Sequence, residues 1–212
     1  MLRMRPAVDV FSEWADAGKD TGMEIGHSPA VNEILSAAFK EMDSSILERG
    51  FTAVDAGCGN GWVVRMLSER DDCSVAIGVD GAPSMIANAL VSDPDGMYSC
   101  ADLMDWSPSE PVDLVHSMEV FYYLKDIPEM LRIIKEKWLT SEGILAFGVD
   151  HYAENEESLT WPGKVGVRMT THSENEWKKI VETAGFDVLR CFRAAPSDDW
   201  PGTLSFVARV SN

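Results

Sequence analysis

The chain has 212 residues and a formal net charge of −17, and 45% of its residues are hydrophobic. This length suits one well-packed domain, and the composition is that of an ordinary globular protein rather than a disordered one. The negative charge disfavours a nucleic-acid substrate, because phosphate backbones select basic surfaces, so we expect no nucleic-acid partner.

Several classes of site and location are disfavoured by what the chain lacks. No apolar run approaches the roughly 20 residues of a membrane span. The basic start, Met1 to Pro6, leads into acidic residues, so we expect no secretory signal and a cytoplasmic protein. The cysteines form no C-x-x-C pair and the histidines no cluster at ligand spacing. We therefore expect neither a disulfide framework nor a metal site.

Helical and extended patterns alternate along most of the chain. Residues 1–29 lack a clear core pattern and are expected to form a helical cap, and Ser28-Pro29 predicts the start of a helix over 30–49. From Phe51 onward, short β-branched runs alternate with helix-like stretches, which predicts a mostly parallel sheet with crossover helices. The expected strands are 51–56, 74–79, 97–101, 112–117 and 144–149, and the expected helices are 62–70, 84–91 and 127–139.

The C-terminal part has a different pattern. Ser173 and Glu176 have the spacing of a capping box, which predicts a helix that ends near Ala184, before Gly185. Two strands are expected next, at 188–194 and 204–210, as an antiparallel pair at the edge of the sheet. The whole pattern predicts one doubly wound α/β domain with a mostly parallel, seven-stranded sheet.

A glycine-rich turn stands where the first strand meets the first crossover helix. It reads Asp55-Ala56-Gly57-Cys58-Gly59-Asn60-Gly61, and glycines there allow positive φ angles and a close approach of a ligand to the backbone. Asp80 ends the second strand roughly 20 residues later, the spacing at which an acid accepts hydrogen bonds from a ribose. The turn and the acid together predict a site for a nucleotide-like cofactor.

The form of this turn, G-x-G-x-G after Asp55, differs from the G-x-G-x-x-G of nicotinamide-binding proteins. It resembles the first motif of the class I S-adenosylmethionine-dependent methyltransferases, and the resemblance covers most of the chain from Phe51 to Asn212. It implies a Rossmann-like fold and S-adenosylmethionine as the cofactor. It also divides the domain into a cap (1–29), a cofactor-binding core (30–149), a substrate-side connection (150–172) and a closing helix and hairpin (173–212).

The resemblance implies roles for residues at the strand ends. Asp55 would face the cofactor's amino group, Asp80 would hold the ribose hydroxyls, and Asp102 would accept a hydrogen bond from the adenine amino group. The full set of expected cofactor contacts is Asp55, Gly57, Gly59, Asp80, Gly81, Met85, Asp102, Leu103, Ser117 and Met118.

The identity of the methyl acceptor is harder to predict. Methyl transfer from a sulfonium needs alignment and exclusion of water, so no universal catalytic residue is expected. The tetrapeptide [DN]-P-P-[YF] of enzymes that methylate adenine or glutamine is absent, since Ser117-Met118-Glu119-Val120 stands in its place. No cysteine follows the fourth or fifth strand, which disfavours covalent attack on a pyrimidine ring. A small-molecule acceptor remains.

Residues just after the fourth and fifth strands are candidates for the acceptor pocket. His151 is our candidate general base, because an unperturbed imidazole titrates near neutrality, and Glu119 is a second catalytic candidate. Acids and aromatic residues in 150–172 suit an amine or cationic acceptor. The residues expected to bind the acceptor are His27, Tyr122, Tyr152 and Trp161.

Other functions remain open from the sequence. The chain could methylate a protein or a tRNA. An NAD-dependent oxidoreductase would share the glycine turn and the ribose acid, and a non-catalytic subunit could bind S-adenosylmethionine while it activates a partner.

Overall fold

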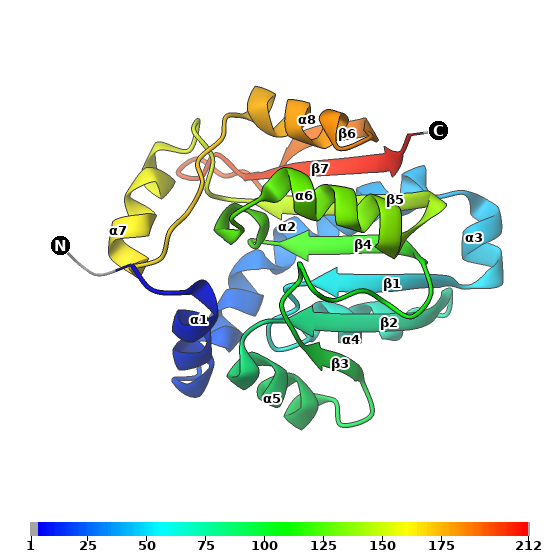
Figure 1. Cartoon of the computed structure of the whole chain (residues 1–212), viewed down its shortest axis with the longest axis horizontal. Coiled ribbons are helices and arrows are strands. Elements are labelled where there is room, and N and C mark those ends of the chain that lie inside the picture. The colour runs from blue at the N-terminus through cyan, green and yellow to red at the C-terminus, as the bar shows by residue number, and fades with distance from the viewer. Residues whose placement is uncertain (1–3, 212) are drawn as a thin grey trace.

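The computed structural model describes residues 4–211, so the first three residues of the basic start Met1–Pro6 lie outside it. One seven-stranded sheet forms its centre, in the order β3-β2-β1-β4-β5-β7-β6 (Figure 1). Strands β1 to β5 are parallel to one another, whereas β7 runs antiparallel to both β5 and β6. The predicted doubly wound α/β fold with an antiparallel closing pair is confirmed.

The elements follow one another in the predicted alternation. The strands are β1 (Phe51–Ala56), β2 (Cys73–Asp80), β3 (Met97–Cys100), β4 (Val112–Met118), β5 (Leu139–Val149), β6 (Phe186–Ala194) and β7 (Thr203–Val210). The helices are α1 (Ala7–Asp16), α2 (Asp20–Glu41), α3 (Ser44–Arg49), α4 (Trp62–Ser68), α5 (Pro83–Ser92), α6 (Ile127–Ile133), α7 (Trp161–Val165) and α8 (Glu174–Thr183), with shorter turns η1 (Phe121–Tyr123), η2 (Ile134–Trp138) and η3 (Glu156–Thr160). Within residues 4–211, no helix is both long and apolar enough to cross a membrane.

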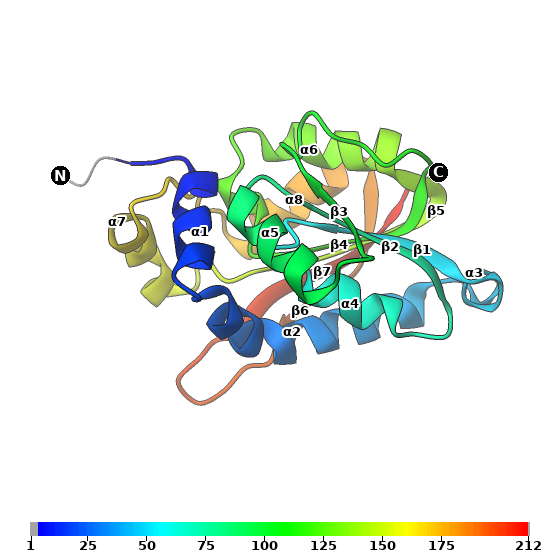
Figure 2. The same ribbon diagram turned by 90° about the horizontal axis from the view of Figure 1, so that it is seen from below.

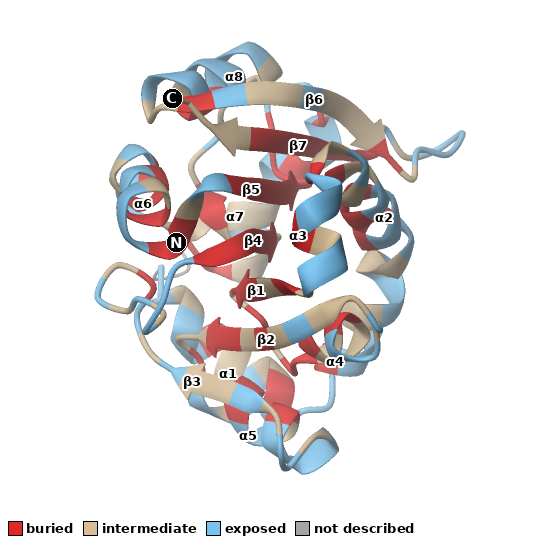
Figure 3. Ribbon diagram, turned by 90° about the vertical axis from the view of Figure 1, so that its right-hand side faces the viewer, coloured by how far each residue is buried: buried red, intermediate tan, exposed pale blue. Residues whose placement is uncertain are grey.

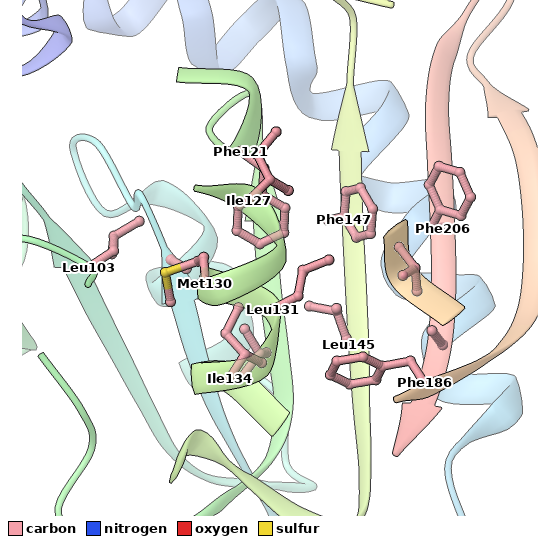
Figure 4. Packing of buried hydrophobic residues seen from close by; sticks show 14 of the residues in the cluster. Leu103, Phe121, Ile127, Met130, Leu131, Ile134, Leu145, Phe147, Phe186 and Phe206 are labelled. Atoms are coloured by element: carbon pink, nitrogen blue, oxygen red, sulfur yellow. The ribbon is translucent and has the colours of Figure 1, made fainter. Parts of the chain in front are cut away.

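Helices cover both faces of the sheet (Figure 2). Successive side chains of a strand point to opposite faces, so Leu145 and Phe147 of β5 pack beneath α6 and α8, whereas Ile144 and Ala146 pack against α2. Figure 4 shows the first of these layers, with Phe147 beside Phe206. Because both faces are covered, the central strands β1, β4 and β5 are buried along most of their length (Figure 3).

The N-terminal helices differ from the expectation. The prediction of one helix over 30–49 is wrong at both ends, because α2 begins at Asp20, contains Pro29 in its interior and stops at Glu41, and α3 is separate. Proline usually begins a helix rather than interrupting one. Here tertiary contacts outweigh that preference, since the buried Asp20 carboxylate accepts hydrogen bonds from Asn60 and Asn88 and anchors the early start of α2.

The other boundaries lie within a few residues of the expected ones, with one exception. Strand β5 begins at Leu139, five residues before the expected start, because it follows the π-turn η2 directly, without the loop that was expected between helix and strand. The capping box is confirmed, since the Ser173 hydroxyl accepts from the Glu176 N–H and the Glu176 carboxylate accepts from the Ser173 N–H.

Candidate active site

A cavity of about 670 Å³ opens at the carboxyl ends of β1, β2 and β4. The turn after β1, the start of α5, the segment after β3 and the segment around η1 line it, and α1 with the first turns of α2 cover it. Ligands of doubly wound sheets bind at this edge. The volume is also in the range of roughly 300–1,000 Å³ that small-molecule sites occupy.

The glycine turn after β1 forms one wall of the cavity. Gly57 has φ +77°, and a Cβ there would meet Val120 Cγ1 at 3.0 Å and Cγ2 closer still, so a larger residue has no room. Gly59 has φ +53°, but its Cβ would meet nothing nearer than Met85 Sδ at 3.8 Å. The space beside Gly59 is therefore open, and a ligand can approach its backbone.

Asp80 organises this turn from the end of β2. One carboxylate oxygen accepts from the Gly59 N–H at 3.0 Å, and the other accepts from the Ala82 N–H at 2.7 Å. Burial raises the pKa of Asp80, against the opposing effect of these two hydrogen bonds. The carboxylate lines the cavity and keeps free lone pairs for further donors, so it can hold hydroxyl groups of a ligand.

Asp55 is buried at the base of the cavity, next to a histidine that the sequence did not single out. Its Oδ1 lies 2.7 Å from Nδ1 of His116, which is fully buried in β4. The other ring nitrogen of His116 has no partner within the described part of the chain. The pairing holds the Asp55 carboxylate in one orientation, and only the parallel register of β1 and β4 brings the two residues together.

The structure brings the expected cofactor contacts together, with one exception. Ser117 is buried, and its hydroxyl donates to the Ala56 carbonyl at 2.8 Å instead of lining the cavity. The positions that line the cavity are Asp55, Gly57, Gly59, Asp80, Gly81, Met85, Asp102, Leu103 and Met118.

Glu119, just after β4, extends into the far end of the cavity. It has φ +63°, which is uncommon for a residue other than glycine and often accompanies function. Its Oε2 accepts from the Tyr122 hydroxyl at 2.6 Å, and its Oε1 accepts from the Asp150 N–H. Burial and the neighbouring Asp150 carboxylate raise the pKa of Glu119 well above its usual range.

His27 and Tyr123 complete this end of the cavity. His27 projects from α2, and its Nε2 lies 3.9 Å from Oδ2 of the buried Asp150. Tyr123 lies edge-on to Phe11 of α1, with ring centroids 5.2 Å apart. Tyr123 and Asp150 lie just after the fourth and fifth strands, where acceptor residues were expected, although their neighbours Tyr122 and His151 were selected instead. Phe11 was missed because α1 meets these strand ends only in the fold.

The other expected acceptor residues do not line the cavity. His151 is buried, with Nδ1 3.0 Å from the Ser158 carbonyl and Nε2 2.8 Å from the Thr171 hydroxyl. The remaining three are Tyr122, behind Glu119; Tyr152, which donates to the Gly202 carbonyl; and Trp161, stacked on Trp200.

The path of the chain after β5 explains this placement. Residues 150–172 fold into η3 and α7 and pair with the first described residues, through a bridge between Arg5 and Val167. The cavity is covered instead by α1 and α2, which the hydrogen bond from Asn60 to Asp20 ties to the glycine turn. The N-terminal segment therefore covers the cavity as a cap, as expected, whereas no described residue of the connection, Trp161 included, lines it.

The lining of the cavity is acidic. Among the described residues that line it, Lys125 is the only lysine, and there is no arginine. The acids in the lining are Asp20, Glu24, Asp55, Asp80, Asp102, Glu119 and Asp126. A cationic ligand is therefore favoured over a polyanion.

A family comparison covers most of the chain. Residues 5–190 match a protein family described as a methyltransferase domain.

Two curated relatives share a name. Trans-aconitate 2-methyltransferase of Rhizobium etli is 29% identical over 158 residues, which are 74% of this chain and 58% of that protein. The protein of the same name from Azoarcus sp. is 36% identical over 93 residues, which are 42% of this chain and 37% of that protein. The chain therefore matches little more than half the length of the Rhizobium relative.

A solved structure is similar over almost its whole length. It is a chain from the complex between the Haloferax volcanii Trm112 methyltransferase activator and a candidate methyltransferase. The TM-score is 0.83 at 28% identity, and the match covers 95% of this chain and 98% of that one.

Proposed function

This chain belongs to the class I S-adenosylmethionine-dependent methyltransferase family, and from that premise we propose that it transfers a methyl group to a small-molecule amine or other cationic acceptor. The observation that carries the proposal is the acidic cavity, whose far end combines the Glu119 carboxylate with the Tyr123 and Phe11 rings. Carboxylates and aromatic faces are the groups that attract a cation.

The residues around the glycine turn fit S-adenosylmethionine. The cofactor supplies an electrophilic methyl group on a sulfonium when it is bound. The open space beside Gly59 admits a ligand against the backbone, and the Asp80 carboxylate is placed to accept hydroxyl donors. Met85 and Leu103 offer apolar surface for a base, and Asp55, oriented by His116, offers an acceptor for an amino group.

The far end of the cavity is where we place the acceptor. Met118 ends β4, and Glu119 and Tyr123 follow it, opposite His27 of the cap. Glu119 would hold the cationic group, and the cap would exclude water from the transfer. His27 and Glu119 thus keep their expected roles, whereas His151, Tyr122, Tyr152 and Trp161 would act only through residues nearer the cavity.

The acceptor of the named relatives is not carried over to this chain. Trans-aconitate is an anion, and in this cavity an anion would meet several carboxylates with Lys125 as the only lysine in the described lining. The match also covers 58% of the Rhizobium protein, so it does not extend to that whole protein or to its acceptor.

The test is a transfer assay with S-adenosylmethionine labelled in its methyl group. The acceptor panel holds primary and secondary amines, trans-aconitate, short peptides and tRNA. We expect label on an amine, and Glu119→Gln should slow that transfer by about 10²-fold or more at pH 7 while calorimetry shows unchanged cofactor binding. Label on trans-aconitate alone would refute the amine class, and label on peptide or tRNA would favour a macromolecular acceptor. Binding of the cofactor without any transfer would favour a non-catalytic subunit, and binding of NAD would favour an oxidoreductase.

A protein partner is a second candidate feature. The similar Haloferax chain comes from a complex with the Trm112 activator, and the match covers 95% of this chain. We therefore include co-expression with Haloferax Trm112 in the assay. Co-purification with increased transfer would support a partner, whereas separate elution and unchanged transfer would contradict it.

A further inference from the structure

Three titratable side chains from distant parts of the sequence meet at the far end of the cavity. His27 comes from α2, Glu119 follows β4 and Asp150 follows β5. One nitrogen or oxygen atom of each lies within 4.8 Å of those of the other two. Glu119 and His27 face the cavity, and Asp150 lies behind them.

Glu119 is held in one position. Its backbone adopts φ +63°, and each of its carboxyl oxygens accepts one hydrogen bond, from the Tyr122 hydroxyl and from the Asp150 N–H. The same two contacts bring its carboxyl group towards that of Asp150. A side chain so constrained can receive a proton from one fixed direction.

Asp150 is buried, and its hydrogen bonding is incomplete. Its Oδ1 has no partner within the described residues, although buried carboxyl oxygens are normally paired. Its Oδ2 is 3.9 Å from Nε2 of His27, whose side chain is 24% exposed. An unpaired buried oxygen beside a second carboxyl group is placed to share or receive a proton.

We propose that Glu119, Asp150 and His27 form one proton-accepting unit, which takes the proton from a protonated amine acceptor before methyl transfer. This inference rests on the proposed function, because it requires an amine acceptor. Glu119 is the catalytic residue of the unit, since it faces the acceptor. Asp150 and His27 act through it.

At the start of the step, Glu119 and Asp150 share one proton. An ammonium acceptor gives a second proton to the Glu119 carboxyl group, the shared proton moves onto Asp150, and the acceptor nitrogen regains its lone pair. That pair forms the bond to the methyl carbon as the carbon–sulfur bond breaks, which leaves S-adenosylhomocysteine and a methylated ammonium. His27 then passes the extra proton to solvent, because it is the member of the unit with an exposed edge.

The electrostatics agree with this use. Burial raises the pKa of Asp150 to about 6, against the opposing effect of the Thr203 hydroxyl, so its proton affinity is about 100-fold above that of an ordinary aspartate. Burial lowers the pKa of His27, which favours the neutral imidazole and its release of a proton to solvent. The other titratable groups beside the unit are Tyr122 and Tyr123, next to Glu119, and Tyr152, whose phenol interacts with Asp150 and with Arg193 on its other side.

A direct test measures the titration of the carboxyl groups. Carbon-13 spectra of protein labelled at Glu and Asp carboxyls, with S-adenosylhomocysteine bound, should show Glu119 and Asp150 titrating as a coupled pair. In Asp150→Asn the proton affinity of Glu119 should fall at least tenfold, because a neighbouring negative charge is removed. Ordinary, independent titration of both groups below pH 5 would overturn the proposal, whatever the acceptor screen finds. If Asp150→Asn does not fold, His27→Gln at the cavity edge serves as the second variant. It leaves Asp150 in place and should shift the pKa values at which Glu119 and Asp150 titrate.

A kinetic test uses the amine that the panel identifies. Transfer by the natural chain should fall about tenfold per pH unit below pH 6, as the unit becomes fully protonated. Glu119→Gln should be about 10²–10⁴-fold slower at pH 7, and its rate should rise about tenfold per pH unit up to pH 9, because the amine then loses its proton to solvent. Glu154→Gln is the matched control, since Glu154 is exposed and outside the cavity, and it should keep the natural profile. If the transfer rate of Glu119→Gln depends on pH as that of the natural chain does, the proposal is overturned. If no amine is methylated at all, the result counts instead against the proposed function.

Discussion

The two glycines after β1 make a matched pair for testing how the turn works. Gly57→Ala places a side chain in left-handed backbone, which costs about 1–2 kcal/mol, and drives its Cβ into Val120, an overpacking that costs a further 1–3 kcal/mol. Gly59→Ala has the backbone penalty alone, since the nearest atom to its Cβ is 3.8 Å away. We therefore expect the free energy of unfolding to fall by about 2–5 kcal/mol in Gly57→Ala and by about 1–2 kcal/mol in Gly59→Ala.

Scanning calorimetry and urea unfolding measure these differences. For a chain of this size, each kcal/mol lowers Tm by about 2–4 °C, so Gly57→Ala should melt roughly 4–20 °C below the natural chain. Gly22→Ala is the control, because Gly22 lies inside α2 with open space around it, and alanine there should stabilise by about 0.5–1 kcal/mol.

The same variants separate folding from cofactor binding. A Cβ at Gly59 would enter the space that we assign to S-adenosylmethionine, so Gly59→Ala should fold but lose most of the rise in Tm that the cofactor causes. Equal stability losses in Gly57→Ala and Gly59→Ala would refute the steric argument. Unchanged cofactor stabilisation in Gly59→Ala would refute the assignment of that space.

Four further predictions concern the site. Asp80→Ala should weaken S-adenosylmethionine binding by about 1.5–3 kcal/mol in calorimetry, the range for hydrogen bonds to a charged group, and unchanged affinity would remove Asp80 from the site. His151→Asn should lower the free energy of unfolding by about 1–3 kcal/mol, because both ring nitrogens of this buried side chain are hydrogen-bonded, and leave turnover per folded molecule unchanged; a 10²-fold loss of turnover would restore His151 as the base. Chelators should leave methyl transfer unchanged, and a loss of transfer that Mn²⁺ restores would show that His27, Glu119 and Asp150 hold a metal instead. Filter binding at low salt should retain neither RNA nor DNA, because the chain carries a net charge of −17, and tight, salt-sensitive retention would reopen a nucleic-acid acceptor.

The cofactor end of the cavity could be predicted because its residues are close in sequence or related by strand order. Gly57 and Gly59 are recognised by the turn that they form, and Asp80 by its position at the end of the next strand. Ser117 was misplaced because consecutive residues of a strand face opposite sides. The Ser117 hydroxyl donates to the Ala56 carbonyl of the neighbouring strand, whereas the next residue, Met118, lines the cavity.

The acceptor end could not be predicted to the same degree. His151 follows Asp150 directly, so an argument from strand ends could not separate the two. The fold does separate them, since the imidazole is enclosed by Ser158 and Thr171 of the connection, while the Asp150 carboxyl group faces His27.

By itself, the sequence determined the order of strands and helices, the glycine turn and a site for a nucleotide-like cofactor. These follow from local physics: the period of buried side chains, the φ angles that glycine allows, and the spacing between a turn and the next strand end. The tertiary structure alone decided that α1 and α2 cover the cavity, and that His27 meets Glu119 and Asp150. Those outcomes depend on contacts between distant segments, such as Asp20 with Asn60, whose energies no local pattern encodes.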